Sequence, residues 1–334
     1  MELGEQEIRT IVEQVVSEFL PKQSLGTQSY PGVFGDIEHA IAAAEKAQRE
    51  YRSTPLEVRR NIVARIRETI LENNENLSRL AVDETGLGRA DDKIQKNRLA
   101  AEKTPGVEDL EPLTYTDEHG MMLTERAPYG VIGAITPSTN PTESIICNAI
   151  GMIAGGNSAV FNPHPSAKSV SALTIALINQ AIEEAGGPRD LITTVQDPTI
   201  ETGQQMMRDP RVALLCVTGG PGVVKAALGT DKKVIAAGPG NPPVVVDETA
   251  HIEKAAQDIV NGASFDNNIV CIDEKEVLVV GSVADRLKGA MRNNHAYELT
   301  REQMDQLTKL IVADPGRRGH EGQINKKYVG KNAR

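Results

Sequence analysis

Short apolar runs alternate with longer helical segments after Pro128, and this alternation constrains the fold more than any other feature of the sequence. Between two of the runs, the segment SAKSVSALTIALINQAIEEAGG has Ser166 as its expected N-cap and ends at Gly186 and Gly187. Apolar runs that alternate with helices pair as parallel strands, so the sequence predicts a doubly wound α/β sheet. Ligands of such sheets bind beyond the carboxyl ends of the strands. The runs are VIGAIT, SAVFNP, LITTVQ, ALLCVTGG, KVIAAG and PVVVDE.

The N-terminal part of the chain divides into a helical pattern and a linker. Residues 1–20 place apolar side chains such as Ile8, Val12 and Phe19 at helical intervals, which predicts a short amphipathic helix. Residues 21–33 are rich in Pro, Gly, Ser and Gln, and this composition favours a linker. The pattern leaves two alternatives for the helix: docking on its own domain, or binding in the groove of a partner.

Residues 36–110 precede the alternating part and are expected to be helical, since Ile62, Ile66 and Ile70 recur every four residues. A polar stretch, residues 114–122, follows. With 334 residues and 40% hydrophobic content, the chain can bury a sizeable core, and its length suggests about two domains.

Composition excludes several classes of protein. The formal net charge is -10, Trp is absent and Phe and Tyr are few, so nucleic acid is not an expected partner. The three cysteines include no CxxC pair, which favours neither a disulfide framework nor a metal site and fits a reducing cytoplasm. We expect no association with a membrane, because no apolar run is long enough to span one and the N-terminus lacks the layout of a secretory signal.

Two glycine-rich turns follow predicted strands, where a ligand of the sheet would lie. They are TGGPG, residues 218–222, and AGPGNPP, residues 237–243. Glycine lets backbone amides approach a phosphate or a flat ring closely, and a helix N-terminus adds favourable partial charge. Neither turn matches the full dinucleotide or P-loop fingerprint, so a tight turn without a ligand stays an alternative.

Several long motifs follow one another along the chain: DETGLGRADDK, KTPGVEDL, APYGVIGAITPSTNPTES, PHPSAK, VTGGPG, GNPPVVVDETA and GASFDNNIVCIDEK. Together they resemble the coenzyme A-acylating aldehyde dehydrogenases of bacterial microcompartments. The resemblance implies an aldehyde dehydrogenase-like α/β fold, with a Rossmann-type NAD- and coenzyme A-binding domain over residues 34–236 and a catalytic domain over residues 237–334. Family members continue past the segment NKKYVG, so we expect this catalytic domain to be incomplete.

The resemblance also implies an activity and partners. The expected enzyme converts a short-chain aldehyde, NAD and coenzyme A into acyl-CoA and NADH, with NADP as an alternative cofactor. The aldehyde stays open among acetaldehyde, propionaldehyde and lactaldehyde. Residues 1–20 would bind a shell protein and direct the enzyme into a microcompartment in the cytoplasm, and a hairpin at about residues 112–128 would serve homo-oligomerisation of the full-length form.

Cys271 is the nucleophile that the resemblance implies. A thiolate adds to an aldehyde carbonyl to give a thiohemiacetal, and loss of hydride to a nicotinamide then leaves a thioester on the enzyme. Cys216 lies inside the apolar run ALLCVTGG and Cys147 among IICNAI, so both are expected to act as small hydrophobic side chains. Asparagines and a turn precede Cys271 instead.

The loop TPSTNP supplies the candidate donors for the oxyanion of the tetrahedral intermediate. Asn140 is favoured as a neutral amide donor, and Thr139 is the alternative from a gap-free alignment of the flanking prolines. Hydrolytic relatives carry a glutamate that activates water, and the matching position here is Ala237. Without that general base, water is poorly activated, whereas a coenzyme A thiolate needs little help. A hydrolytic aldehyde dehydrogenase and a catalytically incomplete cargo fragment are the alternatives.

The cofactor residues follow from the resemblance to the family's adenosine-binding wall. Hydrolytic relatives use a lysine where Asn162 stands, which leaves the choice between NAD and NADP open. Lys168 is either a phosphate contact or a solvated helix lysine, and His164 is either a wall residue or a turn histidine. The expected cofactor-binding residues are Pro137, Ser138, Pro163, His164, Pro165, Thr218, Gly219, Gly220, Gly222, Gly238 and Gly240.

Overall fold

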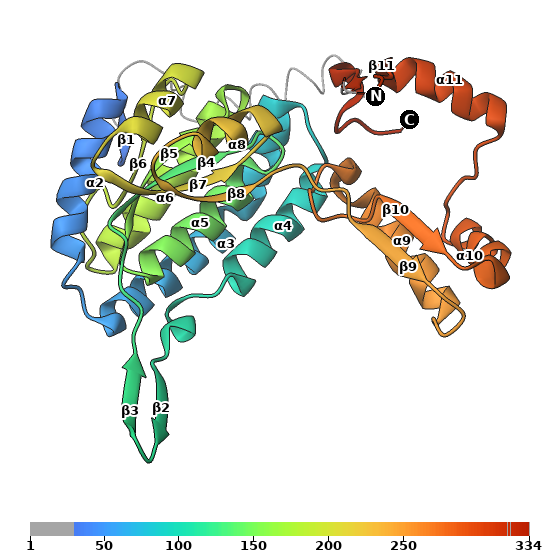
Figure 1. The fold of residues 1–334 in the computed structure, drawn as a ribbon. Helices are drawn as coiled ribbons and strands as arrows, with labels where there is room; N and C mark the ends of the chain where they lie inside the picture. Colours follow the sequence, from blue (N-terminus) through green and yellow to red (C-terminus); the bar gives the residue numbers. More distant parts are fainter. Residues whose placement is uncertain (1–29, 319, 321, 334) are drawn as a thin grey trace, which may run out of the picture. The chain divides into compact units, whose positions relative to one another are not determined.

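A computed structural model describes residues 30–333 except residues 319 and 321 (Figure 1). The predicted amphipathic helix of residues 1–20, and all of the predicted linker before Tyr30, lie outside the described residues. All elements below belong to one compact unit, Pro31–Arg334.

A six-stranded, all-parallel sheet with strand order β1-β6-β5-β4-β7-β8 forms the centre of this unit (Figure 1). After the central strand β4, the chain builds β5 and β6 on one side and then β7 and β8 on the other. This reversal confirms the predicted doubly wound sheet and creates a crevice at the carboxyl ends of the central strands. The strands are β1 (Val33–Phe34), β4 (Val131–Thr136), β5 (Ser158–Pro163), β6 (Ile192–Val195), β7 (Val212–Thr218) and β8 (Lys233–Ala237).

Helices cover both faces of the sheet, as the apolar strands require. Neighbouring residues of β7 show this directly: Leu214 is buried in the cluster formed with α3, α5 and α6, while Leu215 is buried in the cluster formed with α2 and α7. Ile62, Ile66 and Ile70 of α3 are fully buried, which confirms the predicted helical face. The helices are α2 (Ile37–Tyr51), α3 (Leu56–Thr85), α4 (Ala90–Lys103), α5 (Pro141–Ala154), α6 (Lys168–Glu184), α7 (Ile200–Arg208) and α8 (Pro221–Leu228), with a 3-10 helix at Val107–Leu110.

The start of α6 corrects one prediction. Ser166 is not the N-cap; it lies inside a 3-10 helix, Pro165–Ala167, and α6 begins after it at Lys168. His164 caps the 3-10 helix, because its Nδ1 accepts a hydrogen bond from the Ser166 amide at 3.2 Å. Pro165 is suited to the first position of a helical turn, so the turn starts earlier than the serine suggested. At the other end, Gly186 follows α6 with a φ of +83°, as expected for a helix stop.

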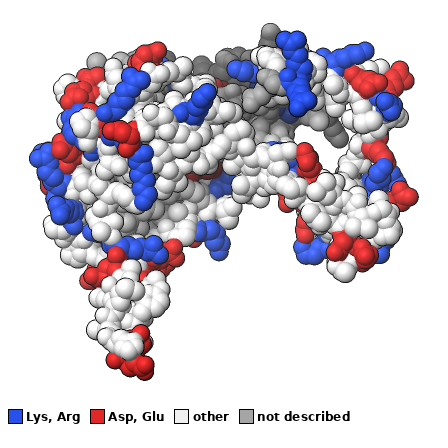
Figure 2. All heavy atoms as spheres, viewed as in Figure 1, with Lys and Arg blue, Asp and Glu red and all other residues white. Residues whose placement is uncertain are grey.

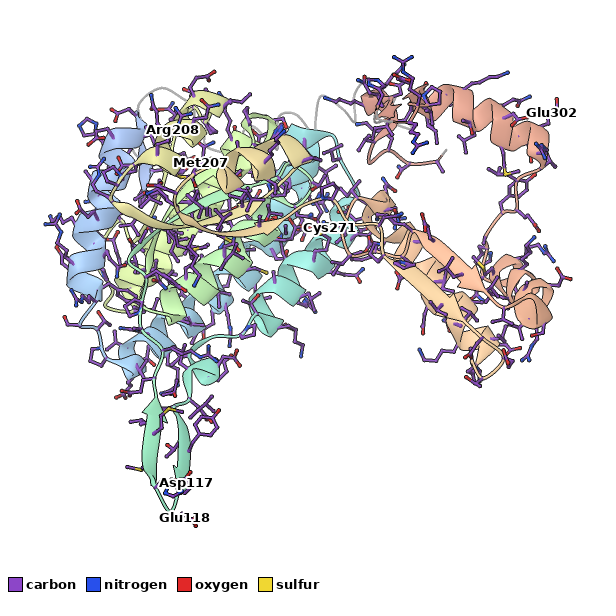
Figure 3. The ribbon with its side chains drawn as sticks, viewed as in Figure 1. Asp117, Glu118, Met207, Arg208, Cys271 and Glu302 are labelled. Carbon is purple, nitrogen blue, oxygen red and sulfur yellow. The ribbon has the colours of Figure 1, made fainter. Side chains whose placement is uncertain are left out.

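A two-stranded antiparallel hairpin lies within the predicted range 112–128. Its strands are β2 (Leu113–Asp117) and β3 (Gly120–Thr124), and all their residues are exposed. Figure 2 shows the sides of the hairpin free of charge and an acidic tip, where Figure 3 labels Asp117 and Glu118. The hairpin therefore presents exposed apolar side chains that nothing in the described chain covers.

After β8 the chain leaves the six-stranded sheet, so the predicted domain boundary at residues 236 and 237 falls at the end of this strand. Strand β9 was predicted from its sequence, but it pairs with β10 in a separate parallel ribbon that packs with α9 and α10 around a third apolar cluster. These elements are β9 (Pro243–Val246), α9 (Ile252–Ser264), a 3-10 helix (Phe265–Asn268), β10 (Glu276–Val279), α10 (Gly281–Asn293), α11 (Arg301–Ile311), β11 (Val312–Asp314), β12 (Gln323–Ile324) and a 3-10 helix (Lys326–Tyr328).

In the part of the chain that the structure describes, none of the helices combines the length and the apolar character needed to cross a membrane.

Candidate active site

A cavity of about 790 Å³ lies at the carboxyl ends of β4, β5, β7 and β8. Its volume is in the range of pockets that hold small-molecule ligands, and its place is the one expected for a doubly wound sheet. Every residue that the sequence predicted for the site lines this cavity, from Pro137 in the loop after β4 to Cys271 before β10. The structure thus brings together segments that are more than a hundred residues apart in the sequence.

Cys271 lies in a turn between the 3-10 helix Phe265–Asn268 and β10, and Figure 3 labels it there. Its side chain is half-buried and lines the cavity. Gly240 packs directly against the backbone of this turn, so a β-carbon at Gly240 would collide with the Cys271 carbonyl oxygen. The glycine turn after β8 therefore has a structural task that the sequence did not reveal: it lets the segment that bears the thiol approach the sheet.

Side-chain hydrogen bonds, rather than a regular backbone hydrogen-bond ladder, stabilise the turn before Cys271. Asp266, Asn267 and Asn268 adopt left-handed backbone conformations, with φ of 44°, 55° and 58°. Asn268 donates hydrogen bonds to the carbonyls of Ala263 (2.8 Å) and Glu274 (3.1 Å), which tie the two ends of the turn together. Short polar residues tolerate this backbone region best, which accounts for the asparagines before the thiol.

Lys275 holds the same turn from its other side. Its ammonium donates to the Asn268 side-chain oxygen at 2.9 Å and to the Val270 carbonyl at 3.0 Å. Lys275 is also a cation in the cavity lining, yet its donors are directed to this backbone. Its role in the structure is therefore to fix the loop that carries Cys271.

The predicted oxyanion donors occupy the loop between β4 and α5. Asn140 stands at the start of α5 and donates from its Nδ2 to the Thr139 hydroxyl at 3.2 Å, while its Oδ1 is buried without a partner in the described chain. The Thr139 carbonyl accepts a hydrogen bond from Lys93 at 3.0 Å. Both residues line the cavity together with Cys271, so a neutral amide donor and a thiol share one space.

The glycine turn after β7 leads into α8 and leaves backbone accessible to a ligand. Gly220 is the N-cap of α8 and Pro221 its first residue. A β-carbon placed at Gly220, Gly222 or Gly238 would meet no atom within 4 Å, so each glycine borders open space and lets a ligand approach the main chain. Free amides at a helix N-terminus bind anionic groups, and this wall therefore fits the pyrophosphate of a dinucleotide.

The turn after β5 forms another wall of the cavity. Burial, together with the nearby Lys326 charge, lowers the pKa of His164, which keeps its imidazole neutral. Asn162 is buried and accepts a hydrogen bond from the Thr202 hydroxyl at 2.6 Å. Lys168 does not line the cavity; it pairs with Asp197 at 2.5 Å on the surface. The solvated alternative for Lys168 therefore agrees with the structure.

Ala237, the residue expected to match the general base of hydrolytic relatives, is the last residue of β8 and does not itself line the cavity. The Gly219 amide donates to the Ala237 carbonyl at 3.1 Å, which connects the two glycine turns. None of the described residues that line the cavity is an aspartate or a glutamate. The cavity thus combines a thiol with amide donors and contains no lining carboxylate to activate water.

Sequence reasoning missed the contribution of α7 to the cavity. Thr199, Gly203 and Met207, all from the segment that follows β6, line it (Figure 3 labels Met207). The capping box at Thr199 and Thr202 marks the start of α7, and this signal could have placed the helix at the carboxyl end of the sheet.

The chain belongs to the aldehyde dehydrogenase family, whose sequence model matches residues 27–314. It is 49% identical to the acetaldehyde dehydrogenase (acetylating) EutE of Escherichia coli over 96% of this chain and 70% of that protein. A propionaldehyde dehydrogenase from the fucose utilisation microcompartment of Clostridium phytofermentans superposes with a TM-score of 0.85 at 47% identity, covering 91% of this chain and 68% of that one. The propionaldehyde dehydrogenase of Rhodopseudomonas palustris, solved with bound CoA and an acylated cysteine, gives 0.84 at 50% identity, covering 90% and 68%. These matches confirm the resemblance that the motifs indicated and the fold that it implied.

Proposed function

We propose that this protein is a CoA-acylating aldehyde dehydrogenase that converts a short-chain aldehyde, NAD and coenzyme A into acyl-CoA and NADH. One observation carries the proposal: the cavity that holds Cys271 has no lining carboxylate among its described residues. The expected match of Ala237 to the base of hydrolytic relatives supports it. An acyl group on the thiol is thus protected from activated water and available to a second thiol. The similarity to an acetylating acetaldehyde dehydrogenase and to a propionaldehyde dehydrogenase supports transfer of the acyl group to coenzyme A.

In the first half of the reaction, the Cys271 thiolate adds to the carbonyl carbon of the aldehyde, and a carbon–sulfur bond forms while the carbonyl oxygen becomes an oxyanion. Asn140 is the proposed donor to that oxyanion, with Thr139 as the alternative. When bound, the nicotinamide supplies the acceptor for the hydride of the thiohemiacetal carbon. Loss of that hydride leaves the acyl group on Cys271 as a thioester.

In the second half, the thiolate of coenzyme A attacks the thioester carbon, and the bond to the Cys271 sulfur breaks. The oxyanion donors are used again, and Cys271 leaves as a thiolate ready for the next aldehyde. A free thiol titrates only a unit or two above neutral pH, so this attack needs no strong base in the cavity.

The proposed ligand walls are the turn at Pro163, His164 and Pro165 and the glycine turns after β7 and β8, with Pro137 and Ser138 beside them. Open space at Gly220, Gly222 and Gly238 is the observation that supports a dinucleotide there. We further propose that NAD and coenzyme A use this wall in turn, because both carry an adenosine and a pyrophosphate.

Residues 1–20 are proposed to bind a shell protein and to place the enzyme inside a bacterial microcompartment, and the β2–β3 hairpin is proposed to join copies of the chain. The microcompartment origin of one structural relative supports the first proposal. Removing residues 1–20 should release the protein from purified shells without changing NADH formation. Encapsulation that is unchanged after this deletion would contradict the targeting role.

The activity is tested by incubating the protein with acetaldehyde or propionaldehyde, NAD and coenzyme A. NADH should appear at 340 nm, and mass spectrometry should find one acyl-CoA per NADH. A carboxylic acid as the main product, with no acyl-CoA, would contradict the proposal.

A further inference from the structure

One buried lysine contacts both segments that form the reaction centre. Lys93, on α4, is fully buried, and its ammonium donates to the Thr139 carbonyl at 3.0 Å and to the Asp266 carboxylate at 3.2 Å. Thr139 belongs to the loop of the proposed oxyanion donors, and Asp266 belongs to the 3-10 helix just before Cys271. Lys93 itself does not line the cavity.

Asp266 is the anchor of this contact on the side of the thiol. Its carboxylate is fully buried and also accepts hydrogen bonds from the Arg89 amide at 2.7 Å and from the Lys96 ammonium at 2.5 Å. Its own amide donates to the Asp92 carboxylate at 2.9 Å. Buried charges are tolerated when they are paired and hydrogen-bonded, and removal of one partner is costly because it leaves the other charge uncompensated.

Gly88 packs closely against the Asp266 carboxylate. A β-carbon at Gly88 would collide with the Asp266 carboxylate, and Gly88 itself has a φ of +77°. Asp266 also begins the run of three left-handed residues that leads to Cys271. Such conformations persist only where the surroundings determine them fully, so the hydrogen bonds of Asp266 stabilise the path of the chain toward the thiol.

Lys96 supplies a second ammonium beside Asp266 and can be compared with Lys93. Lys96 pairs with Asp266 and with Glu143 at 3.1 Å. Burial opposes its charge, but the carboxylates of Glu143 and Asp266 outweigh burial and raise the pKa of Lys96. Lys96 thus connects Asp266 to the first turn of α5 through side chains, whereas Lys93 donates to the backbone of the loop that carries Thr139 and Asn140.

We propose that Lys93 is a positioning residue: it ties the loop of Thr139 and Asn140 to the segment that precedes Cys271, and so fixes the spacing between oxyanion donors and nucleophile. This inference rests on the proposed function for its catalytic meaning, but the connection itself is a statement about structure. A small displacement at a reaction centre slows chemistry strongly. Within the described part of the chain, the hydrogen bonds of the Lys93 side chain go to Thr139 and Asp266 and not to the glycine turns of the ligand walls.

The test is the Lys93→Met variant, which keeps most of the length of the side chain and removes the donor, compared with Arg59→Met. Arg59 is also a buried cation, but it donates to the Thr54 carbonyl at 3.0 Å and lies over the Tyr51 ring, away from the cavity. Hydrogen exchange read by mass spectrometry should show peptides over residues 137–144 and 262–271 exchanging about tenfold faster in Lys93→Met, with α5 and α6 unchanged beyond their ends. Arg59→Met should leave both of these peptides as in the wild type.

Steady-state kinetics supply the second measurement. In Lys93→Met, kcat per folded molecule should fall about tenfold to a hundredfold, while KM for NAD and coenzyme A stays within about twofold. If Lys93→Met does not fold, Asp266→Asn replaces it and should loosen the same peptides. Unchanged exchange in either variant, or faster exchange spread evenly over the whole protein, overturns the inference. Absence of NADH from the wild type would contradict the proposed function instead, since the exchange result does not depend on turnover.

Discussion

Cysteines occur in two kinds of region, regular elements and an irregular turn. The backbone around the thiol differs between them, although all three side chains are half-buried. Cys147 and Cys216 lie in α5 and β7, within regular hydrogen-bonded backbone. Burial raises the pKa of both thiols, so little thiolate forms at neutral pH. Cys271 lies in an irregular turn and lines the cavity. Exposure alone does not separate these thiols; the backbone around them does.

The comparison shows how this fold presents a reactive side chain. The helix and the strand that carry Cys147 and Cys216 satisfy their backbone hydrogen bonds internally, whereas the turn before Cys271 depends on side chains such as Asn268 and Lys275 for its hydrogen bonds. A loop built in this way can face a cavity and still be fixed.

The largest expected effect separates the thiols directly. Cys271→Ser should lower NADH formation by about a thousandfold or more, because a serine hydroxyl is a far weaker nucleophile without an adjacent base. Cys147→Ser and Cys216→Ser should keep activity within a few-fold of the wild type. Full turnover by Cys271→Ser, measured with aldehyde, NAD and coenzyme A, would remove the basis of the comparison.

Glycine substitutions in the two regions test the same difference between the turn and the regular elements. Gly240→Ala should reduce kcat about tenfold to a hundredfold, because the new methyl group meets the Cys271 carbonyl and displaces the thiol. Gly133→Ala is the matched change in β4, where the methyl group meets Val212 and Leu215 at 3.0 and 3.1 Å. That variant should lose thermal stability but retain its kcat per folded molecule. Equal losses of activity in both variants would show that the turn has no special sensitivity.

Ala237→Glu is expected to change the product rather than the rate of hydride transfer. A carboxylate at the end of β8 should activate water, and we expect the ratio of acid to acyl-CoA to rise about tenfold, well below the full effect of a general base. Ala236→Glu is the control, since adjacent residues of a strand point to opposite faces. Chromatographic analysis of the products should find the change only in Ala237→Glu.

The smallest effect concerns pH. Burial raises the pKa of Asp273, two residues after the nucleophile, from 3.8 to about 6, and its Oδ2 has no partner in the described chain. Because the folded state holds this proton more tightly than the unfolded state, the contribution of Asp273 to stability is greatest below about pH 4 and is lost as the pH rises to about 6. Allowing for partial hydration, the loss is about 1 kcal/mol.

Urea unfolding of the wild type and of Asp273→Asn checks this sign. The asparagine does not titrate, so the variant should become more stable relative to the wild type as the pH rises from 4 to 7. A difference in unfolding free energy between the variant and the wild type that stays constant with pH would contradict the prediction. Variants at Cys147 or Cys216 are not expected to show this pH dependence.

The sequence predicted the sheet well because buried parallel strands are continuous apolar runs, and each predicted run is a strand. It did not show that β9 pairs outside the main sheet, since an apolar run does not name its partner. Ser166 was placed wrongly because Pro165 begins a 3-10 turn before it. For the cavity, motifs found the lining loops, but the contact of Lys93 with Asp266 joins residues 173 positions apart, and no local pattern signals it.

The exposed hairpin has a consequence for how the protein ages. Met121 and Met122 of β3 are 76% and 57% exposed, whereas Met206 and Met207 of α7 are buried. An oxidant such as peroxide therefore reaches the hairpin thioethers first and converts them to sulfoxides. An apolar ribbon then becomes polar, and stored protein is expected to lose its affinity for hydrophobic surfaces before its core is damaged.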